Sequence, residues 1–82
     1  MKVVLLPQAQ RDLDVIFEPL LSRIVRRLRM LERFPSLGAP MMGPFSGCRS
    51  TVVGMFRIVC RPLRDKIIEV AYIRDCRRAP LA

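Results

Sequence analysis

The segment that decides the fold is "RSTVVGMFRIVCRPLRDKIIEVAYI" (residues 49–73). It contains three apolar stretches rich in β-branched residues, at 49–53, 55–61 and 67–73, with Gly54 and the short run "PLRDK" between them. β-Branched and aromatic residues favour strands, and connections this short favour antiparallel neighbours. We therefore predict a three-stranded antiparallel meander.

Alternation of side chains assigns the residues of the last two strands to two faces. The face toward the core is predicted to hold the apolar members: Phe56, Ile58, Cys60, Ile68, Val70 and Tyr72. The opposite face then receives Arg57 and Arg61, with Glu69 as their cross-strand partner. The sequence thus predicts a sheet with one face on the core and one face that carries arginines.

Two helices are predicted before this meander. The run "KVVLLP" (residues 2–7) is typical of a buried strand, and apolar residues then recur at helical spacing over 8–18. Pro19 interrupts the pattern and suits the start of a second helix, which continues to about Arg33. We predict one α+β domain over residues 1–82, in the order β-α-α-β-β-β, with a helical hairpin packed on an antiparallel four-stranded sheet.

A Gly/Pro-rich segment joins the two halves of the chain. "FPSLGAPMMGPFSG" (residues 34–47) contains three prolines and three glycines, which favour a loop. Its large apolar side chains are Phe34, Leu37, Met41, Met42 and Phe45. Such residues in a loop indicate packing over the edge of the core or onto a partner.

The charge of the chain is strongly positive. Fifteen Lys and Arg residues face seven Asp and Glu, which gives a net charge of +8, and all but two of the cations are arginine. Arginine suits phosphate and carboxylate, so a surface of this kind attracts nucleic acid or an acidic protein. For the arginines of the second predicted helix, a solvated face and contact with a partner both remain open.

Several kinds of site are not expected. The chain has no His, and Cys48, Cys60 and Cys76 show no CxxC spacing, so we expect no metal and reduced cytoplasmic thiols. No Gly-rich phosphate motif is present, so we expect no cofactor and no small-molecule ligand. No apolar run approaches the length of a membrane span or of a secretion signal, so we expect a cytoplasmic protein with no membrane contact.

Three stretches carry a resemblance to a known family: "LPQAQRDLDVI" (residues 6–16), "GPFSGCRSTVVGMFRIVCR" (43–61) and "IIEVAYIRDCRRAP" (67–80). In this order they resemble the RelE/ParE superfamily of toxins from bacterial type II toxin–antitoxin systems. The resemblance implies a growth-inhibiting toxin, of the kind associated with plasmid stabilisation, which an acidic antitoxin neutralises. We expect the antitoxin to cross the apolar surface near Phe34–Phe45, with Phe34, Leu37, Met41, Met42 and Phe45 as its contacts, and to neutralise the basic edge of the sheet.

The superfamily contains two activities. RelE-like members cut mRNA in the ribosome, whereas ParE-like members are associated with poisoning of DNA gyrase. The resemblance places the arginine of the family's third strand at Arg57 and its terminal arginine at Arg77 or Arg78. The family's basic pair falls on Arg49 and on Thr51, so one cation is missing. If the chain is a nuclease, the catalytic candidates are Arg49, Arg57, Arg77 and Arg78.

RNA cleavage also needs a general base and a general acid. The sequence offers few candidates: Tyr72 is predicted in the core, Asp75 in an ion pair among arginines, Glu69 across from a strand arginine and Lys66 in a turn. We therefore favour a ParE-like toxin that inhibits gyrase by binding and is not an enzyme. The predicted target-binding residues are Arg57, Arg61, Arg74, Arg77 and Arg78. The alternatives are a ribosome-dependent mRNA endonuclease and a stand-alone nucleic-acid-binding module.

Overall fold

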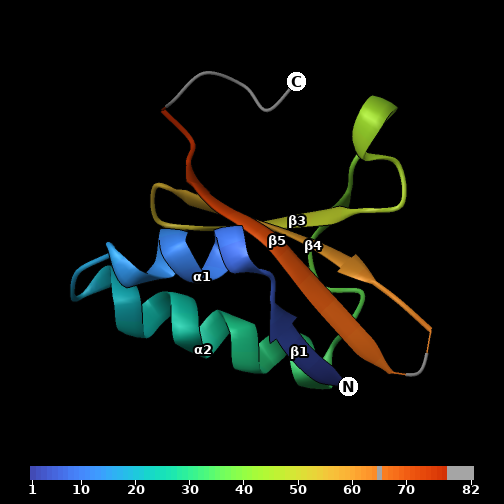
Figure 1. The fold of residues 1–82 in the computed structure, drawn as a ribbon, viewed down its shortest axis with the longest axis horizontal. Helices are drawn as coiled ribbons and strands as arrows, with labels where there is room; N and C mark the ends of the chain where they lie inside the picture. The colour runs from blue at the N-terminus through green and yellow to red at the C-terminus, as the bar shows by residue number, and fades with distance from the viewer. Residues whose placement is uncertain (65, 78–82) are drawn as a thin grey trace.

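Two helices pack on one face of a five-stranded sheet in the computed structural model, which describes residues 1–64 and 66–77 (Figure 1). The elements in chain order are β1 (Lys2–Leu5), α1 (Pro7–Asp14), α2 (Leu20–Arg33), β2 (Ala39–Pro40), the 3₁₀ helix η1 (Gly43–Phe45), β3 (Arg49–Val53), β4 (Phe56–Pro62) and β5 (Ile67–Asp75). The predicted α+β class and the predicted order of helices and principal strands are confirmed.

The sheet has the order β1-β5-β4-β3-β2 and is mixed. The predicted antiparallel meander of β3, β4 and β5 is present, but β1 pairs parallel to β5 and β2 adds a fifth strand. The expectation of a purely antiparallel sheet of four strands was wrong in these two respects. A short turn between strands makes them antiparallel, but no short turn joins β1 to the meander. Both helices and the Gly/Pro-rich segment lie between them, so the local sequence does not set the direction of β1.

One of the two helices is shorter than predicted. α1 ends at Asp14 and not near Glu18, and residues 15–18 form a non-helical connection to Pro19. The side chain of Phe17, one of the apolar residues within the predicted helix 8–18, is exposed. α2 has the predicted extent, with Pro19 as its N-cap residue and a cis peptide bond before that proline. No helix in the described ranges is long and apolar enough to cross a bilayer.

The core lies between the helices and the sheet. Its fully buried members include Ala9, Ile24, Leu31, Ile58, Cys60, Ile68 and Val70. The helical members recur at intervals that place them on one side of α1 or α2, and the strand members alternate as predicted. Cys60 is a core residue, as its phase in β4 predicted. Burial raises the pKa of its thiol, the neighbouring Cys48 raises it further, and Arg49 opposes the shift.

A β-bulge in β5 reverses one predicted orientation. Cys60 pairs with Val70, but the preceding Val59 pairs with Tyr72, so Ala71 is an extra residue in β5. The bulge brings Ile73 into the core in place of Tyr72, whose side chain is only partly buried. The prediction that Tyr72 packs in the core is therefore wrong. Simple alternation could not show the extra residue.

The segment 34–47, predicted as loop throughout, contains two short regular elements. β2 lies at the edge of the sheet, where a proline costs no ladder hydrogen bond, and η1 follows it. Gly38 precedes β2 with a φ of +94°. A Cβ atom at this position would lie 2.4 Å from the carbonyl oxygen of Ser50, so the close approach of the two backbones requires glycine.

We expect Gly38→Ala to destabilise the domain more than Gly43→Ala does. Gly43 also has a positive φ of +67°, but no atom lies within 4 Å of its missing Cβ, so alanine there adds backbone strain alone, about 1–2 kcal/mol. At Gly38 the clash with the backbone adds roughly a further 1–3 kcal/mol. Urea denaturation of the two variants measures the difference. Equal losses at the two positions would contradict the close approach described here.

Candidate target-binding surface

The face of the sheet away from the helices carries a cluster that we call the arginine face: Arg57, Arg61, Tyr72 and Arg74. β4 and β5 bring these side chains together, because Arg57 pairs with Arg74 and Arg61 pairs with Glu69. Their neighbours Ile58 and Ile73 point to the core, which sets the opposite orientation of the arginines. Three of the five predicted target-binding arginines thus lie on one face of the sheet, and two of them, Arg57 and Arg74, are direct cross-strand neighbours.

The centre of the arginine face is a pair of like charges. Arg57 and Arg74 lie directly opposite each other on neighbouring strands, an arrangement that is destabilising unless an anion compensates it. The guanidinium carbon of Arg74 lies 5.0 Å from the centre of the Tyr72 ring, within range of a cation–π contact. The Nε of Arg74 is buried and has no hydrogen-bond partner. The ring holds Arg74 beside Arg57, and their combined charge suits an anionic partner.

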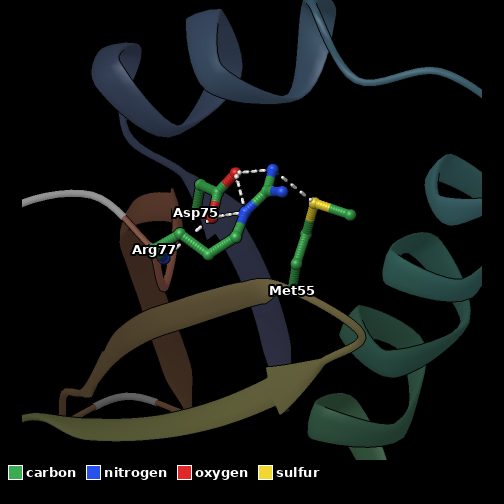
Figure 2. Close-up of polar contacts among 3 residues, drawn as sticks. All are labelled: Met55, Asp75 and Arg77. Atoms are coloured by element: carbon green, nitrogen blue, oxygen red, sulfur yellow. Dashed lines mark hydrogen bonds and ion pairs between the residues drawn. The ribbon is translucent and has the colours of Figure 1, made fainter.

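Arg77, another of the predicted target-binding arginines, lies beyond the end of β5. Arg77 donates hydrogen bonds to Asp75 through Nε and Nη2, the latter at 2.7 Å, and its Nη2 also lies 3.1 Å from the Sδ of Met55 (Figure 2). The carboxylate raises the pKa of Arg77, first through its hydrogen bond and then through its charge. The predicted ion-pair role of Asp75 is confirmed. Arg78, the remaining predicted residue, lies outside the described residues.

Arg49 does not join the arginine face. It pairs with Cys60, whose side chain is in the core, so Arg49 starts on the face of the sheet that the helices cover. Its Nη2 donates to the carbonyl oxygen of Gly38 at 2.8 Å. The next helix-facing position is Thr51, which is buried and accepts a hydrogen bond from Arg27 of α2. The structure therefore separates Arg49 from Arg57, although the nuclease alternative requires both.

The apolar side chains predicted to bind an antitoxin fall into two groups. Phe34 and Met42 are exposed, with relative accessibilities of 55% and 87%. Leu37 packs against the core, and Met41 and Phe45 are partly buried. Three of the five side chains are therefore held in the fold, whereas the other two are available to a partner.

The acid–base candidates do not form a pair. Asp75 is occupied by Arg77, Glu69 lies opposite Arg61, and Lys66 has a φ of 60° in the turn before β5, as predicted. Tyr72 lies against the guanidinium of Arg74. No group of three residues capable of holding a metal ion occurs in ranges 1–64 and 66–77. Sequence reasoning missed Tyr72 as a surface residue, and only the bulge at Ala71 identifies it.

A cavity of about 290 Å³ lies between α1 and the end of β5, with Arg74 and Asp75 in its wall. Asp12 of α1 forms another part of the wall and accepts a hydrogen bond from the backbone N–H of Ile73 at 3.0 Å. β1 pairs only with residues 67–70 of β5, so it does not reach the backbone N–H of Ile73. The carboxylate of Asp12 accepts this hydrogen bond instead. The contact fixes α1 to the end of β5 that carries the arginine face.

Comparison with protein families gives a match over nearly the whole chain. Residues 3–80 match the family model described as the ParE toxin of the type II toxin–antitoxin system parDE. The chain belongs to the ParE toxin family. A search of curated proteins finds no match. The predicted membership of the RelE/ParE superfamily is confirmed.

Solved structures of toxins share the fold of this ParE family member. The RelBE2 toxin–antitoxin complex of Mycobacterium tuberculosis has a chain that is 22% identical, with a TM-score of 0.82 over 90% of this chain and 95% of that one. The isolated RelE toxin of E. coli is 12% identical, with a TM-score of 0.79 over 95% and 86%. A chain of the chromosomal ParDE system of P. aeruginosa is 21% identical, with a TM-score of 0.70 over 92% and 95%.

Proposed function

We propose that this toxin acts as ParE-like toxins do, by binding DNA gyrase through the arginine face and Arg77, and that it is not an enzyme. Membership of the ParE toxin family supports the proposal at the level of the whole chain. The carrying observation is that Arg57 pairs with Arg74 across β4 and β5, and that neither forms an ion pair with a carboxylate of residues 1–64 and 66–77. Tyr72 lies against Arg74. A binding toxin needs such a complementary surface and no proton-transfer pair.

The same toxin is proposed to be neutralised by an acidic antitoxin in the cytoplasm. The similar chains of Mycobacterium tuberculosis and P. aeruginosa come from toxin–antitoxin systems, and this chain has a net charge of +8. We place the apolar part of the contact on Phe34 and Met42, whose side chains are exposed. An acidic partner would bind quickly by electrostatic attraction, while apolar anchors would slow its dissociation.

A ribosome-dependent mRNA endonuclease is the second candidate, and the orientation of Tyr72 favours it more than the sequence did. A phenol beside Arg57 and Arg74 provides one group that can donate or accept a proton and two cations for developing negative charge. Arg49, however, lies on the other face of the sheet, and Asp75 is held by Arg77. The set of residues available for nuclease chemistry is therefore smaller than the set predicted from the sequence.

The two activities are separated by parallel assays of the purified toxin. We expect the toxin to inhibit supercoiling of relaxed plasmid by gyrase and to leave mRNA intact on programmed ribosomes. Tyr72→Phe removes the only hydroxyl in the arginine face but keeps the ring under Arg74, so this variant should retain gyrase inhibition. Codon-dependent mRNA cleavage that Tyr72→Phe abolishes, together with unaffected gyrase, would show that the nuclease candidate is correct.

A further inference from the structure

The five arginines of α2 divide into two sets with different surroundings. Arg27 donates to the Thr51 hydroxyl and to the carbonyl oxygen of Val52, at 3.5 Å for the latter, and the guanidinium of Arg23 lies beside Gly54. These two side chains thus turn toward β3 and the turn after it. The three others are all exposed and turn away from the core: Arg26, Arg29 and Arg33.

These three arginines form one line along the outside of α2, which we call the α2 stripe. At 100° and 1.5 Å per residue, they fall within an arc of about 60° and extend over about 10 Å of the helix. The one ion pair within the described ranges involves Arg77 and Asp75, far from this line in the sequence. None of the three arginines thus forms an ion pair with a described carboxylate, although Glu18 lines the same hollow as Arg26 and Arg29.

We infer that the α2 stripe binds the phosphate backbone of duplex nucleic acid without regard to sequence. Over about 10 Å of its axis, duplex DNA presents about three phosphates on each strand, which equals the number of arginines in the stripe. The planar guanidinium fork binds phosphate through two parallel hydrogen bonds. This function is separate from that of the arginine face, which lies on the opposite side of the sheet from the helices.

The composition of the stripe favours nucleic acid over an acidic protein. Protein interfaces are depleted of charge at their centre and enriched in apolar and aromatic groups, whereas interfaces with DNA are polar and strongly positive. Only Met30, with a relative accessibility of 38%, adds an exposed apolar side chain between these arginines. At the end of the stripe, Arg33 lies 5.9 Å from the ring centre of the exposed Phe34. This pairing orients Arg33 along the helix.

The test is the salt dependence of binding to a short duplex. Fluorescence anisotropy of labelled duplex DNA, and of duplex RNA with the same sequence, is measured with the full chain between 50 and 200 mM salt. The triple variant Arg26→Gln, Arg29→Gln, Arg33→Gln should make the slope of log K against log salt shallower by about 2.7. Raising the salt from 50 to 200 mM should then weaken its binding about 40-fold less than it weakens binding of the wild type. Glutamine is a good helix former, so α2 should keep its structure.

A matched variant controls for the loss of net charge. Lys2→Gln, Arg11→Gln, Arg64→Gln removes the same three charges from exposed positions outside both α2 and the arginine face, and should keep most of the wild-type slope. Equal slopes for the two triple variants would overturn the proposal, because binding would then follow overall charge. Preferential binding of poly-glutamate through the α2 stripe, with no effect on the duplexes, would also overturn it and indicate an acidic protein. The two duplexes distinguish DNA from RNA as the source of the phosphates.

Discussion

Replacing both Arg57 and Arg74 with glutamate is expected to abolish growth inhibition while the domain stays folded. In the wild type the two guanidinium groups stand opposite each other on β4 and β5, so the pair already repels itself. Charge reversal removes the attraction for an anionic target surface and introduces repulsion. Each lost charge-assisted contact weakens binding by about 1.5–3 kcal/mol, so the double variant should bind its target at least a hundredfold more weakly.

The measurement combines growth after induction with the gyrase assay described above. The control is Arg11→Glu together with Arg64→Glu, which changes the net charge equally at exposed positions outside the arginine face. This control should remain toxic. Full toxicity of the variant at Arg57 and Arg74, with normal expression, would show that the arginine face does not bind the target. Thermal melting of both variants establishes that loss of activity is not loss of folding.

Truncating Ile58 to alanine should produce the largest loss of stability in the sheet. Ile58 is fully buried at the centre of β4 and pairs with Thr51 on one side and Ile73 on the other. Removal of its side chain leaves a cavity between the sheet and the helices, which costs about 2–5 kcal/mol. This amount is a large fraction of the stability expected for a domain of this size.

The matched control for this change is Val52→Ala on β3. Val52 is also a β-branched strand residue, but its relative accessibility is 49% and it faces away from the core. The loss there should stay below about 1 kcal/mol, mostly through the lower strand propensity of alanine. Urea denaturation of both variants gives the comparison. Similar losses at the two positions would contradict the assignment of the core to the helix-covered face.

The local pattern of the sequence predicted the elements well where physical periodicity is strong. The alternation in β4 placed Ile58 and Cys60 in the core and Arg57 and Arg61 outside it, and the structure agrees. The helical spacing and the proline between the helices predicted α2. Such patterns depend on neighbouring residues alone, so a single sequence contains them.

Features that depend on distant parts of the chain were not predictable in this way. The parallel pairing of β1 follows from the path of the chain through both helices, and no nearby residue encodes it. The orientation of Tyr72 depends on the single extra residue Ala71, and a bulge leaves no distinct mark in an apolar run. The separation of Arg49 from Arg57 likewise follows from the faces of two strands and not from their composition.

The hydrogen bond from the Ile73 amide to Asp12 has a consequence for self-association. A strand edge with free amide groups is a template on which another chain can add a strand, and such edges promote aggregation. Beyond Val70, β5 has no β1 neighbour, and its buried Ile73 would make that edge attractive to an incoming apolar strand. The charged side chain of Asp12 satisfies the amide and places a carboxylate where a strand would approach. Asp12, one of seven acidic residues in a chain of net charge +8, thus makes this part of the β5 edge less available to an added strand.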